Sequence, residues 1–229
     1  MIKNINNYRR EKKIKIKKRQ LTLWLNKLKS YAIPNLMRYI IFGMAGVYVL
    51  DLFLTPALGN SVSSFLDFSL AAILQGQVWR LITFIFCPPA LNILFFIIML
   101  YFYWMIGSYM DNQWGSFKFN LYYFCGMLLT MLAGLFTGYA TNYYVNLSVF
   151  LAFALTNPNF EILLFFVLPI KVKWLALLDG LLFLYEFIYS NWPAKIALLL
   201  SLLNIAIFLS ADIKYLFSNN RHKNPRRYN

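Results

Sequence analysis

Residues 107 to 115 read GSYMDNQWG and join two long apolar stretches of the chain. Gly107 and Gly115 each lie four residues from Asp111. Glycines at this spacing let helices and a tight turn approach closely, and a carboxylate between them can cap backbone N–H groups of the following helix. We therefore predict two closely packed helices joined by a tight turn, and a structural role for these three residues.

The composition of the whole chain is that of a membrane protein. Of its 229 residues, 60% are hydrophobic and 19% are aromatic, whereas only eight are acidic. A soluble domain with one core and a solvated exterior does not have this composition. The formal charge of +14 would suggest nucleic acid in a soluble protein, but the basic residues gather at the two ends of the chain. Anionic lipid headgroups are the nearer partner there, so we predict membrane lipid and no nucleic acid.

The apolar stretches predict an all-α, polytopic membrane protein. A helix needs about 20 apolar residues to cross a bilayer. Six candidate spans lie near residues 36–55, 89–110, 117–138, 144–157, 174–190 and 193–211. The fourth has about 14 residues, roughly 21 Å of helix, so we expect neighbouring helices to shield it at the centre of the bundle. Residues 160–170 are apolar but too few to span, which suggests an interfacial or re-entrant element.

The spans divide the chain into three regions. Residues 1–35 form a basic N-terminal segment, residues 36–212 the six-helix membrane domain, and residues 213–229 a basic tail. The N-terminal segment lacks the apolar region and cleavage site of a secretory signal peptide. Two interpretations of it stay open: an amphipathic helix on the inner leaflet, or a solvated basic tail that only enforces topology.

Charge predicts the orientation of these spans. With six spans and a cytoplasmic N-terminus, 20 of the 22 Lys and Arg residues lie on the cytoplasmic side or at its interface, leaving only Arg80 and Lys195 outside. Cytoplasmic loops of membrane proteins carry such an excess of basic residues. We therefore predict that both termini are cytoplasmic.

A tryptophan and an arginine, Trp79 and Arg80, precede the second span on the outer side. Together with residues 107–115 and with Ser148 near the start of the fourth span, they resemble the rhomboid superfamily. That family carries a Gly-x3-Glu-x3-Gly motif, here with aspartate in place of glutamate, and a similar tryptophan-arginine pair that closes its first extracytoplasmic loop. The resemblance covers roughly residues 36–211 and implies a six-helix rhomboid-like bundle, whose outer loop Trp79 and Arg80 organise.

The positions that would carry proteolysis in this family are largely replaced. Rhomboid proteases use a serine in a Gly-x-Ser-Gly context, a histidine on the sixth span, and a His-x3-Asn pair on the second span that assists the oxyanion. The corresponding residues here are Asn92, Phe96, Asn146, Ser148 and Lys195. The only histidine, His222, lies in the polar tail. Acyl transfer needs a nucleophile, a base and oxyanion donors in one place, so we predict that Ser148 is structural and that the chain does not cleave.

An enzymatic alternative stays open. Ser148 and Lys195 both begin helices at the outer side, and a serine-lysine dyad would make the chain an intramembrane serine protease. Glu186 lies at a depth comparable to that of Lys195, however. An ion pair between them would keep the lysine charged and unable to act as a base.

A transport or permeation component is a further alternative, since polar residues interrupt the spans. These residues are Asp51, Asp179, Glu186 and Asn204. They are costly in lipid and should face the bundle or water. Neither an inverted repeat nor a broken helix accompanies them, which disfavours transport.

The resemblance therefore implies a pseudoprotease, similar to derlins, that binds transmembrane segments of client proteins without cleaving them. We expect no cofactor and no metal, since Cys87 and Cys125 form neither a disulfide framework nor a ligand cluster. The Asn, Lys, Ile and Phe bias of an AT-rich genome suggests the cytoplasmic membrane of a bacterium. The client and the oligomeric state stay open.

Overall fold

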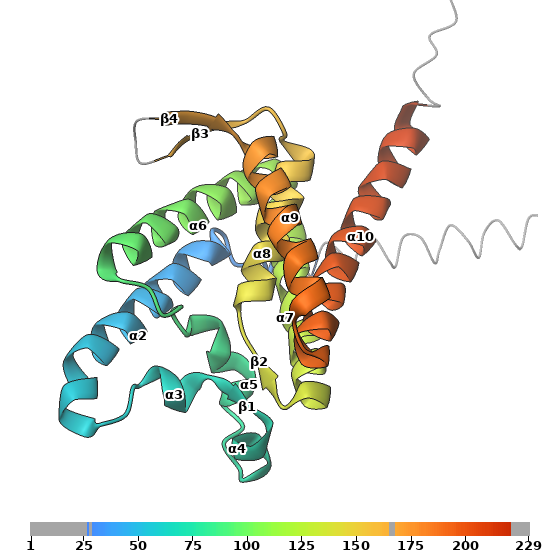
Figure 1. The fold of residues 1–229 in the computed structure, drawn as a ribbon. Helices are drawn as coiled ribbons and strands as arrows, with labels where there is room; N and C mark the ends of the chain where they lie inside the picture. The colour runs from blue at the N-terminus through green and yellow to red at the C-terminus, as the bar shows by residue number, and fades with distance from the viewer. Residues whose placement is uncertain (1–26, 28, 165–167, 221–229) are drawn as a thin grey trace, which may run out of the picture.

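The computed structural model describes residue 27 and residues 29–164 and 168–220. Most of the predicted N-terminal segment, and the end of the tail with His222, lie outside these residues. Six long helices correspond in position to the six predicted spans (Figure 1). They are α2 (Leu36–Leu58), α6 (Ile93–Trp114), α7 (Ser116–Thr137), α8 (Tyr143–Thr156), α9 (Val172–Tyr189) and α10 (Trp192–Asn220). The last continues past Asp212, where we expected the tail to begin.

Three of these helices are long and apolar enough to cross a membrane: α2 over residues 36–57, α6 and α7. Helix α8 and residues 192–208 of α10 are apolar but shorter. The prediction of a mostly helical chain is therefore confirmed, and the length and composition of these three helices agree with a membrane-embedded protein. That the chain crosses the membrane six times stays a prediction.

Short elements connect α2 to α6. These are α3 (Ser63–Leu66), β1 (Phe68–Ser69), α4 (Leu70–Leu74), α5 (Arg80–Thr83) and the 3-10 helix η1 (Phe84–Phe86). Strand β1 pairs antiparallel with β2 (Tyr139–Ala140), which follows α7. The loop before α6 is thereby joined to the loop before α8, so both lie at the same end of the bundle (Figure 1).

The all-α prediction also missed a hairpin between α8 and α9. Strands β3 (Glu161–Leu164) and β4 (Leu168–Lys171) pair antiparallel, with Glu161 opposite Lys171. Two further backbone hydrogen bonds, from Val172 to Phe160 and from Lys173 to Pro158, extend this pairing. An apolar run too short to span satisfies its backbone groups by folding back on itself. Opposite charges at facing strand positions also favour the pair.

The core of the molecule surrounds α8. This helix packs against α6, α7, α9 and α10, and ten of its 14 residues are buried. The expectation that the short fourth helix is central is confirmed. Its neighbours supply the shielding that its length alone could not provide.

Candidate functional site

The motif at residues 107–115 joins three helices. A side chain at Gly107 would clash with Met37 of α2, so the missing side chain is what allows α2 and α6 to touch. Gly115 has a φ of 80° and separates α6 from α7, a conformation that glycine adopts without strain. The Asp111 carboxylate accepts hydrogen bonds from the Asn35 backbone N–H at 3.3 Å and from the Ser116 hydroxyl at 3.0 Å. It therefore ties the starts of α2 and α7 to the end of α6.

Arg80 holds the loop between α2 and α6 together. Its side chain is buried, and it donates to the backbone carbonyls of Ser64 at 2.9 Å and Asp67 at 2.8 Å. It also pairs with the Asp67 carboxylate and donates from Nε to the Gln77 amide oxygen at 2.8 Å. The Trp79 indole N–H, by contrast, donates to a loop carbonyl at 3.1 Å from an exposed position. These bonds join Arg80 and Trp79 to the loop between α2 and α6.

Ser148 lies in the packed interior of the bundle. Its side chain is 1% exposed, and its hydroxyl donates to the carbonyl of Val145 in the preceding turn at 2.7 Å. Its own carbonyl accepts from the Tyr122 hydroxyl at 2.7 Å. No hydrogen bond joins Ser148 to Lys195 in the part of the chain that the structure describes. The dyad geometry is thus not formed here.

The other positions aligned with catalytic residues have separate environments. The Asn92 side chain caps the start of α6 by accepting from the Phe95 N–H at 3.1 Å. Phe96 is buried and stacks on Tyr48 of α2, with ring centroids 4.0 Å apart. Asn146 is buried in α8 and accepts from the Tyr123 hydroxyl at 3.4 Å.

The expected ion pair between Glu186 and Lys195 is not formed. The ion pair that the structure shows joins Arg80 to Asp67. Glu186 instead accepts a hydrogen bond from the Tyr144 hydroxyl at 2.8 Å. The Lys195 amine lies over the rings of Phe187 and Trp192. A tyrosine of the neighbouring α8 satisfies the carboxylate, and the lysine lies against one aromatic ring of α9 and one of α10.

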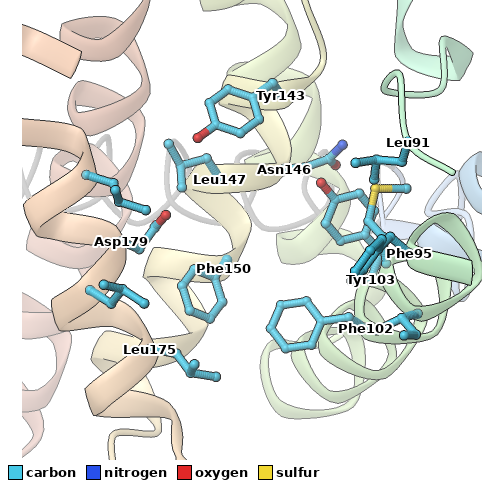
Figure 2. A pocket seen from close by; sticks show the side chains of 14 residues that line it. Leu91, Phe95, Phe102, Tyr103, Tyr143, Asn146, Leu147, Phe150, Leu175 and Asp179 are labelled. Carbon is cyan, nitrogen blue, oxygen red and sulfur yellow. The ribbon is translucent and has the colours of Figure 1, made fainter. Parts of the chain in front are cut away.

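A cavity of about 480 Å³ lies between α6, α8 and α9 (Figure 2). Helix α8 forms its floor, since it packs against both other helices. The lining is mainly aliphatic and aromatic: Leu91, Phe95, Ile98, Met99, Phe102, Leu147, Phe150, Leu175, Leu178 and Leu182. Phe95 at 49% exposure on α6 and Leu178 at 56% on α9 place its mouth at the surface. The cavity is therefore a cleft that opens between α6 and α9.

Four polar side chains also line this cleft: Tyr103, Tyr143, Asn146 and Asp179. Figure 2 shows Asp179 on one wall, Tyr103 on the opposite wall, and Tyr143 and Asn146 on the helix between them. One carboxylate oxygen of Asp179 and the amide nitrogen of Asn146 are buried without a hydrogen-bond partner. Buried polar groups are normally paired, so these two atoms mark the cleft as the best candidate site.

Sequence reasoning identified the polar residues of this site only in part. It singled out Asp179 as a polar residue in a span and Asn146 as an altered catalytic position, but not the two tyrosines. Tyr103 and Tyr143 stand in apolar stretches rich in aromatic residues, so nothing local distinguished them. For metals, no group of three or more candidate ligands occurs among the described residues.

Comparison with known proteins assigns no family. No protein-family model matches the chain, and no curated protein sequence matches it significantly. The function must therefore be argued from the cleft and from the residues around Ser148.

Proposed function

We propose that this chain is a rhomboid-like membrane protein that binds transmembrane segments of other proteins in the cleft between α6 and α9 and does not cleave them. We place it, as a six-span protein with both termini cytoplasmic, in the cytoplasmic membrane of a bacterium. The observation that carries the proposal is an apolar cleft, open at the helix surface, with one unpartnered polar atom at its floor and another on its wall.

The polar floor favours a helical occupant over a lipid chain. Inside a bilayer an apolar surface gains little by exchanging lipid for helix, because lipid tails are as apolar as leucine. Association there depends on close packing and on hydrogen bonds between helices. An acyl chain cannot use Asn146 or Asp179, whereas a side chain from a bound helix can hydrogen-bond to them.

The surroundings of Ser148 support binding without cleavage. Its hydroxyl is bonded back to its own helix, and Lys195 is held over aromatic rings. A serine nucleophile needs a base within hydrogen-bond reach. We therefore expect Ser148→Ala to leave client binding unchanged.

Site-specific cross-linking in nanodiscs tests the proposal. A photoreactive phenylalanine analogue is placed at Leu178 or Leu182, which line the cleft, and in matched controls at Leu177 or Leu181, which do not. All four positions are similarly exposed, at 54% to 57%. The probe is a synthetic 21-residue Leu/Ala helix with polar ends and one central serine.

We expect the peptide to cross-link at both cleft positions several times more strongly than at the control positions. Its mass should remain intact after long incubation, and a fluorophosphonate probe should not label the protein. Equal cross-linking at all four positions would refute client binding in the cleft. Cleavage that disappears in both Ser148→Ala and Lys195→Ala would instead establish the serine protease.

A further inference from the structure

Asp179 forms no ion pair with the side chains that the structure describes. It is the eighth residue of α9, close to the middle of that helix, and it lies on the wall of the cleft (Figure 2). Its Oδ2 atom is buried without a hydrogen bond. An ionisable group within a membrane segment is costly and almost always pairs with another group.

The nearby charged residues are already engaged elsewhere. Glu186, two turns further along α9, is bonded to Tyr144. The Lys173 amine lies over the Trp174 ring, and the Lys195 amine lies over Phe187 and Trp192. No cation of the described residues pairs with Asp179. One wall of the cleft therefore carries an acidic group, and no described basic side chain pairs with it.

We infer that the cleft selects membrane segments that carry a lysine or arginine at the depth of Asp179, and that this basic side chain pairs with the Asp179 carboxylate. The inference rests on the proposed function and adds the chemistry of the client to it. A long basic side chain suits the cleft, because its methylene stem can lie along the apolar lining while its head reaches the acid.

The hydroxyls of Tyr103 and Tyr143 complete a polar end for such a cation. Lysine carries three N–H donors and arginine five, and these point in different directions, so one carboxylate cannot reach all of them. The hydroxyl oxygens of Tyr103 and Tyr143 are further acceptors that line the same cavity. A neutral apolar segment would leave the buried Asp179 Oδ2 atom without a partner.

The test compares four peptides in nanodiscs, each a 21-residue Leu/Ala helix with polar ends. The first has a central lysine, the second a central leucine, the third a central glutamate, and the fourth a lysine shifted seven residues toward one end. Binding is measured by competition for the cross-link at Leu178. The proteins are the wild type, Asp179→Asn, and the matched control Glu186→Gln, which changes a carboxylate that is already bonded.

We expect the central-lysine peptide to bind the wild type about tenfold more tightly than the leucine peptide, and the glutamate peptide to bind more weakly than either. The preference should vanish in Asp179→Asn, persist in Glu186→Gln, and fall when the lysine is shifted. Equal affinity of the wild type for lysine and leucine peptides would overturn the inference while leaving the proposed function intact. Absence of binding by every peptide would overturn both. The lysine, leucine and glutamate peptides are compared on the wild-type protein, so the test holds even if Asp179→Asn fails to fold.

Discussion

At the scale of single residues, Arg80 and Asp111 show how a charged side chain serves a membrane protein by organising backbone. Each is 6% exposed, and each bonds to groups from segments far apart in the sequence. Arg80 binds one carbonyl within α3 and one directly after it, and Asp111 binds the backbone N–H of the residue before α2. These bonds offset part of the cost of burying a charged group, although the Asp111 Oδ1 atom is buried without a hydrogen-bond partner.

Replacing Arg80 with alanine should destabilise the protein by about 2–4 kcal/mol, since a buried charged group and its bonds are lost together. Arg38→Ala is the matched control, because Arg38 is exposed at the start of α2 and should change stability by less than about 0.5 kcal/mol. Thermal unfolding in detergent measures both. Equal melting temperatures for the two variants would contradict an organising role for Arg80.

Cys87 should be a poorly reactive thiol. Burial, with the Asp67 and Asp51 carboxylates adding and Arg80 opposing, raises the pKa of Cys87 to about 12. Between about pH 8.5 and 12, the Cys87 thiol of the folded protein keeps a proton that an ordinary thiol of pKa about 8.5 has lost. At pH 8.5 we therefore expect iodoacetamide to modify Cys87, in a Cys125→Ala background, at least about tenfold more slowly than the SDS-unfolded chain.

The sign of the effect also predicts a pH dependence. The pKa of Cys87 is higher in the folded protein than in the unfolded chain. The contribution of this thiol to the free energy of unfolding is therefore complete below about pH 8.5 and is lost as the pH rises toward 12. Cys87→Ser should remove this part of the fall in stability with rising pH. Alkylation of native Cys87 as fast as that of the unfolded chain would show that burial does not suppress its ionisation.

At the scale of elements, close helix contacts depend on glycine where backbones meet. Gly107 allows α6 to reach Met37 of α2. Gly126 of α7 faces Asn204 of α10, whose amide nitrogen would lie 2.9 Å from an added Cβ. Small residues at helix interfaces are the usual means of close packing in membranes.

Gly107→Ala should therefore destabilise the protein by about 1–3 kcal/mol, because the new methyl group overlaps Met37 and the helices must separate. Gly46→Ala is its control, since a side chain at that position of α2 meets nothing within 4 Å. The melting temperature of Gly46→Ala should equal or exceed that of the wild type. A smaller loss from Gly107→Ala than from Gly46→Ala would contradict close packing of α2 on α6.

At the scale of the whole molecule, hydrogen bonds between loops show which loops lie at the same end of the bundle. Asn142, before α8, donates to the carbonyls of Ile85 and Cys87, before α6. At the opposite end, Gln113 of α6 and Asn157 after α8 bond to each other through their amides. The chain thus alternates between ends as an up-and-down bundle does.

Single-cysteine labelling tests whether these two ends face opposite sides of a membrane. In a background without Cys87 and Cys125, exposed positions Asn60 and Asn191 represent one end, and exposed Asn112 and Asn159 the other. We expect an impermeant maleimide to label the first pair in intact bacterial cells and the second pair only after permeabilisation. Labelling of Asn60 and Asn112 from the same side would contradict the predicted topology.

The sequence by itself determined the class of the protein and the approximate place of its long helices. Length and hydropathy are local properties, so apolar stretches marked α2, α6 and α7 to within a few residues. The glycines and the aspartate at residues 107–115 likewise indicated a tight junction. The β3–β4 hairpin was missed because a short apolar run has no periodicity that separates strand from helix.

Only the tertiary structure decided which polar residues share one environment. Glu186 and Lys195 looked like partners from their depth alone, yet the direction of each side chain gave them different neighbours. The cleft unites Tyr103, Asn146 and Asp179 from three helices. Depth along a helix follows from sequence position, but the direction a residue faces depends on how each helix is rotated and packed against its neighbours, and that is a property of the assembled bundle.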